Sequence, residues 1–429
     1  MRGMKRLLVL VLAGVLAGCM FLDVKKQQEK LGAACTIKGT ARSLQSPDRA
    51  VVALLLRGKV PGEKADGNWD IASHFVLEHA GRFVFTVRDG TGTYTVGAFD
   101  NADGDMVLGP DEAFIMDNDV VTCTPGAQID GFVLNVPERP DQRGTRLRIA
   151  GLQTITMDQQ VSAVFGQRAA VGELTSLVED MFSDQVAQSS LWRPLDFLVE
   201  GYAGVYFLET YDPNRVPVLF VHGINGSPAH FKYLIEHLDH KRFQAWVYYY
   251  PSGLHLGTIA DQLNQTITRL QVRYRVPRFA VVGYSMGGLV SRGFIVRHQQ
   301  SRSATDIPLY VTISTPWGGA KSAESGIKTA PAVVEVWRDM VPGSDYQKSL
   351  FALPLPSQMQ HHLLFTFQRK TSSFGESDDQ GVTVASQLAM PAQANAVRLY
   401  GFDDTHVGVL HNPEVSQLLN ELLAKAFPR

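Results

Sequence analysis

The most constraining feature of the sequence is a Gly-x-Ser-x-Gly motif set between a strand-like run and a helical pattern. The motif is Gly283-Tyr284-Ser285-Met286-Gly287; residues 279–282 precede it and the helical pattern covers 286–298. This setting forces the serine onto a tight, strained turn, where flanking side chains would collide with the strand and helix. Glycine removes those side chains. The motif therefore predicts a buried strand leading into a helix, with Ser285 as a candidate nucleophile.

The chain around this motif alternates between strand-like and helix-like segments from about residue 201 to its end. Such alternation implies βαβ units and a mostly parallel sheet. The expected strands are 216–221, 243–250, 279–283, 309–314, 363–367 and 397–400. The expected helices are 229–238, 258–274, 286–298 and 413–427. Residues 201–429 are thus predicted to form an α/β domain.

A second glycine-containing turn, His222-Gly223-Ile224-Asn225-Gly226, follows the buried run 217–221. Together with the serine motif it resembles the α/β-hydrolase family, in particular bacterial lipases and esterases. A Thr-Pro-Trp-Gly-Gly run at 315–319 adds to the resemblance, which covers about residues 200–429. The resemblance implies a Ser-His-Asp triad, with the backbone amides of Ile224 and Met286 holding the oxyanion.

The resemblance places the catalytic base after the last strand and before the terminal helix, where His406 lies. His411 is the competing candidate. His222 stands at the start of the oxyanion turn, and a structural role is expected for it because this fold orders its triad as Ser, acid, His. His361 and His362, at the start of a strand, are also expected to be structural.

The acid is expected after the penultimate strand. In the family it commonly precedes a valine by three positions, and Asp379 stands in that relation to Val382. Asp378 is the alternative. The acid holds the imidazole tautomer and stabilises the imidazolium, so it must reach the base. Asp403 and Asp404 are too close to the base in sequence and are expected to be solvated loop charges.

The resemblance implies a serine hydrolase that cleaves carboxylic esters, preferably lipid or other acyl esters, through an acyl-enzyme and without a cofactor or metal. An acyltransferase with the same triad is the rival enzyme, and a surface binding protein without turnover is the rival outside enzymes. The formal net charge of −2 argues against a polyanionic partner, so nucleic acid binding is not expected.

Residues 35–136 carry short β-like runs, such as 50–56, 82–87 and 93–99, separated by Gly, Asp and Pro. They predict a small β-sandwich that resembles transthyretin-like and carboxypeptidase-regulatory modules. Residues 101–105 with Glu112 have oxygen ligands near EF-hand spacing, but Met106 stands where that loop requires glycine. A solvated turn is therefore expected in preference to a calcium site near Asp103.

Two further segments carry apolar residues at helical spacing. Residues 137–200 are expected to form a helical connector; its apolar positions are Leu174, Leu177, Val178, Met181 and Phe182. Residues 320–360 are long enough for a cap; its apolar face is formed by Val333, Val336, Trp337, Met340 and Val341. Core packing is the default interpretation of that face, and an acyl-chain groove or mobile lid is the functional alternative.

Residues 1–18 are typical of a bacterial lipoprotein signal peptide. Basic residues precede the apolar run 7–16, which is too short to span a bilayer, and Leu16-Ala17-Gly18-Cys19 resembles a lipobox. Cys19 would then carry the lipid anchor, with residues 19–34 as a polar tether. Met20 favours the outer membrane of the bacterial envelope by resemblance to known lipoproteins. An ordinary signal peptide is the alternative.

Setting Cys19 aside leaves one pair of cysteines, Cys35 and Cys123, in a protein expected to be exported. Export permits a disulfide between them. Two buried free thiols are the alternative.

Overall fold

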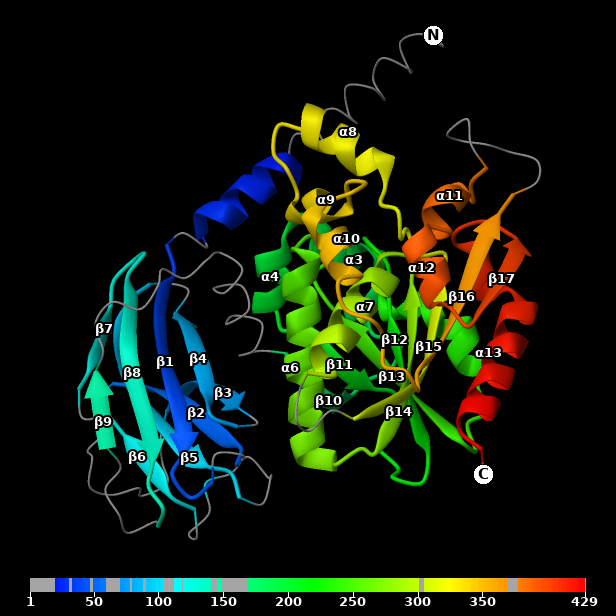
Figure 1. Ribbon diagram of the computed structural model, residues 1–429. Helices are drawn as coiled ribbons and strands as arrows, with labels where there is room; N and C mark the ends of the chain where they lie inside the picture. The colour runs from blue at the N-terminus through cyan, green and yellow to red at the C-terminus, as the bar shows by residue number, and fades with distance from the viewer. Residues whose placement is uncertain are drawn as a thin grey trace. The chain divides into compact units, whose positions relative to one another are not determined.

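A computed structural model describes the fold (Figure 1). The described residues are 20–30, 33–46, 49–58, 70–77, 79–87, 90–102, 108, 112–117, 119–139, 145–148, 169–300, 305–368 and 377–428. They divide into a β unit, formed mainly by residues 28–169, and an α/β unit, formed mainly by residues 170–429. Cys19 and the signal peptide lie outside the described residues, so the lipoprotein assignment stays a prediction. No helix among the described residues has both the length and the apolarity to cross a bilayer.

The β unit contains two sheets. Its strands are β1 (Cys35–Ser43), β2 (Val51–Arg57), β3 (Ile71–Leu77), β4 (Gly81–Val87), β5 (Gly92–Asp100), β6 (Phe114–Met116), β7 (Val121–Cys123), β8 (Gln128–Val136) and β9 (Thr145–Arg148). One sheet has the order β4-β1-β8-β9, and the other has the order β3-β2-β5-β6 with β7 beside β5. Ile37 and Phe85 of the first sheet share one buried core with Ala53 and Val96 of the second. The expected β-sandwich is therefore confirmed.

A disulfide joins Cys35 to Cys123, as expected from the cysteine count. It links the start of β1 to the end of β7 and so ties the two sheets together. Most of residues 101–112, where a solvated turn is expected in preference to a calcium site, falls outside the described residues. Within the described part, Glu112 accepts a hydrogen bond from the backbone N–H of Ala102 at 2.6 Å.

The α/β unit is organised around one eight-stranded sheet with the order β10-β11-β13-β12-β14-β15-β16-β17. The strands are β10 (Ala170–Leu174), β11 (Gly204–Phe207), β12 (Val216–Val221), β13 (Phe243–Tyr249), β14 (Arg278–Tyr284), β15 (Asp306–Ile313), β16 (Gln360–Phe367) and β17 (Arg398–Asp403). All neighbours from β13 to β17 are parallel, and β11 runs antiparallel to β13. The central strands are buried along almost their whole length, which explains their continuous apolar sequences. This is the α/β-hydrolase fold.

Helices connect and cover these strands (Figure 1). They are η1 (Asp180–Phe182), α3 (Asp184–Trp192), α4 (Pro194–Val199), η2 (Pro228–Phe231), α5 (Lys232–Glu236), α6 (Leu256–Tyr274), α7 (Met286–His298), α8 (Lys321–Thr329), α9 (Glu335–Met340), α10 (Asp345–Leu350), α11 (Val384–Gln387), α12 (Met390–Asn395), η3 (Gly408–His411) and α13 (Pro413–Ala426). Helix α7 begins directly after β14 and packs against β14 and β12. This contact fixes the turn between β14 and α7.

Two segments differ from the sequence-based expectation. Residues 20–30, expected to be part of a polar tether, form a helix. Leu174 belongs to strand β10 rather than to a helical connector, and its side chain is exposed, as is that of Val178. Their helical spacing therefore did not reflect a buried helical face. Pairing with β11, which no local pattern reveals, determines the conformation of this segment.

Candidate active site

Ser285 lies on the sharp turn between β14 and α7. Its φ is 51° and its ψ −128°, a conformation that residues with side chains rarely adopt. A Cβ on Gly283 would lie 2.8 Å from the Cα of Gly288, and a Cβ on Gly287 would lie 2.0 Å from the carbonyl oxygen of Val221. Glycine is therefore required on both sides of the serine, and the second contact places the turn against the end of β12.

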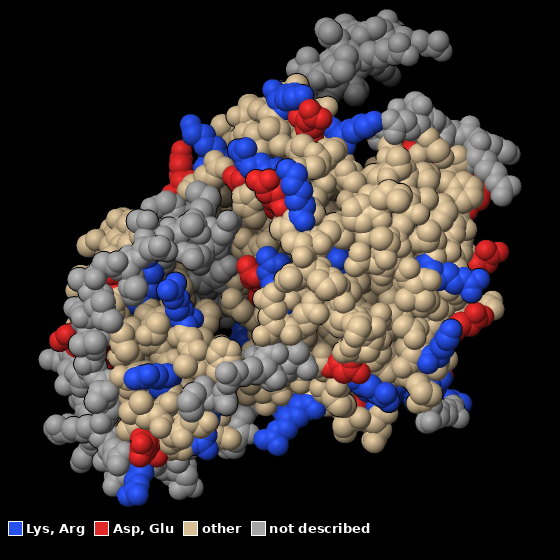
Figure 2. All heavy atoms as spheres, in the orientation of Figure 1, with Lys and Arg blue, Asp and Glu red and all other residues tan. Residues whose placement is uncertain are grey.

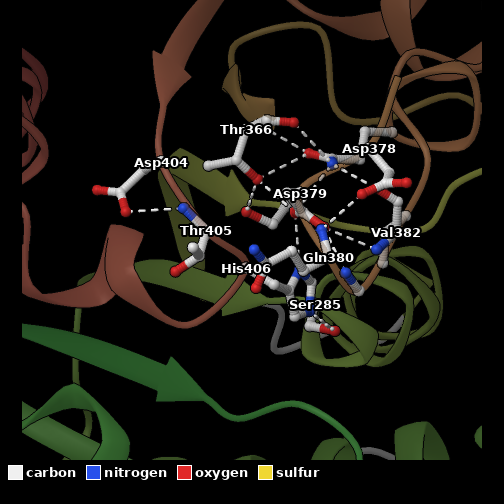
Figure 3. Close-up of polar contacts among 12 residues, drawn as sticks. Ser285, Thr366, Asp378, Asp379, Gln380, Val382, Asp404, Thr405 and His406 are labelled. Carbon is white, nitrogen blue, oxygen red and sulfur yellow. Dashed lines mark hydrogen bonds and ion pairs between the residues drawn. The ribbon is translucent and has the colours of Figure 1, made fainter. Parts of the chain in front are cut away.

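The side chains of Ser285, His406 and Asp379 form a hydrogen-bonded series (Figure 3). Nε2 of His406 is 2.9 Å from Oγ of Ser285, and Nδ1 of His406 is 2.8 Å from Oδ2 of Asp379. His406 follows β17, and Asp379 lies between β16 and α11. A neutral imidazole can donate from Nδ1 to the carboxylate and accept from the hydroxyl at Nε2. The structure thus brings together the three side chains selected from the sequence.

The Asp379 carboxylate is fully buried and accepts hydrogen bonds at both oxygens. Oδ1 accepts from the backbone N–H groups of Gly381 at 2.9 Å and Val382 at 2.7 Å. Oδ2 accepts from the Thr366 hydroxyl at 2.5 Å and the Gln387 amide at 3.0 Å, besides the imidazole. Burial alone would raise the pKa of Asp379, but the hydrogen bond and charge of the His406 imidazole, together with the donors from Thr366 and Val382, outweigh it and hold the pKa below its ordinary value.

Asp378, the alternative acid, is equally buried, but its carboxylate makes a hydrogen bond to the backbone of its own loop. Its Oδ1 accepts from the backbone N–H of Gln380 at 2.8 Å, and its own carbonyl accepts from Gln368 at 3.0 Å. The carboxylate that meets the histidine is therefore that of Asp379.

The other candidates near the C-terminus lie apart from this series. His411 is exposed, with its ring centroid 6.1 Å from that of Tyr233. Asp404 was expected to be a solvated charge, but its carboxylate accepts from the backbone N–H of Thr405 at 2.8 Å and from Nδ2 of Asn412 at 3.0 Å. Asp404 therefore fixes the loop that carries the histidine.

The turn after β12 lies against the nucleophile. A Cβ on Gly223 would be 3.0 Å from the Cβ of Ser285, so any larger residue would press on the serine. Met286 is the first residue of α7, where a backbone N–H has no partner within the helix. Among the described residues, neither this N–H nor that of Ile224 makes a hydrogen bond. Both amides are therefore available to an oxyanion formed near Ser285.

The buried histidines are structural, as predicted. His222 stacks on Tyr250 with ring centroids 4.1 Å apart, and its Nδ1 donates to the Gly223 carbonyl at 2.7 Å. His361 lies 3.0 Å from the Thr312 hydroxyl. Burial lowers the pKa of each histidine to about 3, so both are neutral at neutral pH. Neutral His222 supports the oxyanion turn through Gly223.

Thr366 and Gln387 contact the acid but were not selected from the sequence. Thr366 lies near the end of β16 and Gln387 at the end of α11, and both are fully buried. A lone threonine in a strand and a lone glutamine in a short helix carry no local signal that they contact the catalytic acid. Their importance appears only once the strands are paired.

A pocket of about 250 Å³ lies beside the acid loop. Gly381 lines it and also abuts the imidazole, since a Cβ there would be 2.7 Å from Cγ of His406. Its other lining residues are Gly318, Gly319, Ala320, Lys321, Ser322, Pro342, Val382, Thr383, Ala385 and Ser386. The pocket can hold a small part of a substrate next to the base. The described residues contain no group of three or more side chains suited to bind a metal ion.

Comparison with known protein families gives a match over residues 214–371 to the family described as "Putative serine esterase (DUF676)". The matched segment includes the oxyanion turn and the serine motif but ends before Asp379 and His406. It supports ester hydrolysis at the level of reaction class. A search of curated proteins gives no match.

Solved structures with similarity to this chain include lipases. The mature lipase BlEst2 of Bacillus licheniformis is 18% identical, covers 50% of this chain and 94% of its own, and has a TM-score of 0.39. Lipase B of Aspergillus fumigatus is 15% identical, covers 53% of this chain and 57% of its own, and has a TM-score of 0.40. A product of Listeria innocua is 15% identical, covers 50% of this chain and 96% of its own, and also has a TM-score of 0.40.

Proposed function

We propose that this α/β-hydrolase cleaves carboxylic esters, with Ser285 as nucleophile, His406 as general base and Asp379 as the acid of the triad. The hydrogen-bonded series from the Ser285 hydroxyl through the imidazole to the carboxylate carries the proposal. Each group has the role its chemistry allows: a hydroxyl that must lose a proton, an imidazole that can take it, and a carboxylate that holds the imidazole in the required tautomer.

The reaction begins when Oγ of Ser285 attacks the ester carbonyl carbon and its proton passes to Nε2 of His406. The amides of Ile224 and Met286 bind the resulting oxyanion. The imidazolium then protonates the departing alcohol, which leaves an acyl group on Ser285. Water then attacks the carbonyl of this acyl-enzyme while His406 takes its proton, and the imidazolium returns that proton to Oγ of Ser285 as the free acid departs.

The preferred substrates are lipid or other acyl esters. Two features support this class. Ser285 is only 5% exposed, so the ester must enter a site largely shielded from water. The pocket beside Gly381 is lined mostly by small residues, together with the charged Lys321, and its size suits a short alkyl or glyceryl group.

The proposal is tested by steady-state hydrolysis of a p-nitrophenyl ester. Ser285→Ala should lower kcat/KM by several orders of magnitude, because loss of one triad member typically has this effect. Ser176→Ala, at an exposed position, is the matched control and should keep the wild-type rate. Retained turnover in Ser285→Ala, with normal folding of both variants, would overturn the assignment. An added alcohol acceptor distinguishes the rival acyltransferase, which would form a new ester in place of the acid.

We also propose that lipidation at Cys19 holds the enzyme at the bacterial envelope, since the lipobox-like residues 16–19 end at that cysteine. Cys19→Ser should abolish incorporation of labelled palmitate and release the protein from the membrane fraction. Native protein with an unmodified thiol at Cys19 would refute the anchor and leave the esterase proposal intact.

A further inference from the structure

Strand β16 extends beyond its neighbour β15, and a side chain takes the place of the missing strand. The chain leaves the sheet after β15 at Ser314, whose φ is 51° and whose N–H makes a last bond to the Leu364 carbonyl at 2.9 Å. Two residues further along β16, the N–H of Thr366 donates to Oε1 of Gln387 at 2.9 Å, and Nε2 of Gln387 donates to the Thr366 carbonyl at 3.0 Å. The Gln387 amide therefore continues the hydrogen-bond ladder of the sheet.

This pairing fixes the orientation of the amide. A backbone N–H can only donate and a backbone carbonyl can only accept, so the oxygen and nitrogen of Gln387 cannot be exchanged. The NH₂ group is consequently directed toward Asp379, whose Oδ2 lies 3.0 Å from Nε2. Position 387 thus delivers a donor to the acid that glutamine can supply and an aliphatic side chain cannot.

A hydroxyl relay reaches the same oxygen. The Thr366 hydroxyl is 2.5 Å from Oδ2 of Asp379 and must donate to it, because an ionised carboxylate only accepts. Oγ of Ser314 is 2.7 Å from the Thr366 hydroxyl, so it donates in turn to that oxygen. Ser314, Thr366, Gln387 and Asp379 all have no exposed surface, so bulk water does not compete for these bonds.

The carboxylate is saturated by these contacts. It accepts from five donors, counting two loop amides, Thr366, Gln387 and His406, whereas its two oxygens offer about four lone-pair sites. Oδ1 is already satisfied by the loop amides alone. The donors from Thr366 and Gln387 converge instead on Oδ2, the oxygen that meets the imidazole, and they oppose rotation of the carboxylate about its Cβ–Cγ bond.

We infer that Thr366 and Gln387 are positioning residues, which hold Oδ2 of Asp379 in the orientation that His406 requires during ester turnover. The inference rests on the proposed function. A carboxylate that rotates away leaves the imidazole without its tautomer control, which slows chemistry and leaves substrate binding unchanged. The expected signature is a loss in kcat at constant KM.

The test compares kcat and KM for a soluble short-chain aryl ester, with active sites counted by fluorophosphonate titration. Thr366→Val removes the hydroxyl and nearly preserves shape. We expect kcat per titrated site to fall roughly tenfold to a hundredfold, by analogy with the loss of outer hydrogen-bond partners at metal-bound side chains, with KM nearly constant. Thr366→Ser restores the hydroxyl and should recover most of the rate. Gln387→Met removes the amide donor and should lower kcat in the same manner, which provides a second test if Thr366→Val does not fold.

Thr312→Val is the matched control, because it also removes a fully buried hydroxyl, one that contacts His361 instead of the acid. It should lower the melting temperature and keep kcat per titrated site. If Thr366→Val and Gln387→Met behave like this control, or if Thr366→Ser gives no recovery, the positioning role is wrong although the enzyme is an esterase. An inactive wild-type enzyme would overturn the proposed function and this inference together.

Discussion

Asp378 and Asp379 are adjacent, equally buried and chemically identical, yet their carboxylates have different partners. Asp379 meets the imidazole at 2.8 Å, whereas Asp378 accepts from the backbone N–H of Gln380 within its own turn. The difference arises because successive side chains along the loop point in different directions. This pair therefore offers a sharp comparison of a triad role with a structural role.

Asp379→Asn should lower kcat by about three to four orders of magnitude, because the amide favours the wrong imidazole tautomer. Asp378→Asn should change kcat far less and show mainly a lower melting temperature. Steady-state kinetics of the two variants, with folding checked by circular dichroism, makes the comparison. The reverse ranking would transfer the acid role to Asp378.

The resemblance to the α/β-hydrolase family was sufficient to select Ser285, His406 and Asp379 as candidates, because the family places each at a fixed position relative to a strand end or a valine. It could not separate Asp379 from Asp378 by chemistry, and it gave no indication of Thr366 or Gln387. Thr366 and Gln387 contact Asp379 because β16 extends beyond the end of β15. That difference depends on strand pairing and not on the local sequence.

At the scale of elements, the segment predicted as a cap forms α8, α9 and α10. Val336 and Met340 of α9 are buried. Trp337 is half-buried, packs edge-on against Trp192 at 6.0 Å, and approaches Gly326 of α8 closely enough that a Cβ there would lie 3.0 Å from the indole. The apolar face of α9 is thus largely occupied by protein.

The outer side of these helices is charged. Lys328 pairs with Glu324 at 2.6 Å and Arg338 with Glu335 at 3.2 Å. Figure 2 shows side chains of both signs gathered at the top of the α/β unit, where Figure 1 places α8 and α9. The helices therefore present a polar side to water and an apolar side to the unit, as a packed helix does.

We expect Trp337→Gln to destabilise the α/β unit by about 2 kcal/mol, as loss of a half-buried indole should. Hydrolysis of four-carbon and sixteen-carbon acyl esters should then fall by the same factor. Val336→Ala, at a fully buried position, is the control. It should also lower the stability and reduce hydrolysis of both esters by one common factor. A loss confined to long-chain esters, without a change in melting temperature, would instead identify Trp337 as part of an acyl-chain groove or lid.

Most strands and helices of the α/β unit were predictable, because buried parallel strands read as continuous apolar runs. Helix α7 was predicted with its observed bounds, as was strand β12. Strands β10 and β11 were not predicted as part of the sheet. They are short, and β10 has exposed residues such as Leu174, so tertiary pairing outweighs their local pattern.

At the scale of the whole molecule, the buried histidines predict acid sensitivity. His222 and His361 have folded-state pKa values of about 3, whereas the unfolded chain takes up protons near pH 6.5. Between these pH values the unfolded state binds more protons than the folded state. The contribution of the two histidines to the free energy of unfolding is therefore fully present above about pH 6.5 and is lost as the pH drops. Each histidine contributes a slope of about 1.4 kcal/mol per pH unit within this window.

His361→Phe should retain the stacking on Tyr310, since the His361 and Tyr310 ring centroids are 4.7 Å apart. It should remove the contribution of His361 to the pH dependence of the free energy of unfolding. The variant should be less stable at pH 8, because the bond to Thr312 is lost, but its melting temperature should fall less steeply from pH 6.5 to 4.5. Thr312→Val, which removes the same hydrogen bond but keeps the buried imidazole, should keep the wild-type slope. Equal slopes for His361→Phe and wild type would contradict the assignment of a neutral buried His361.

The most direct test of the central claim is to locate the covalent adduct formed with a fluorophosphonate. The phosphonyl group replaces the proton of an activated serine hydroxyl and expels fluoride, which mimics the acylation step. Peptide mass spectrometry of the inactivated full-length protein should find one adduct, on Ser285, in proportion to lost activity, and none in Ser285→Ala. An adduct on another residue, or full inactivation without modification of Ser285, would contradict the account.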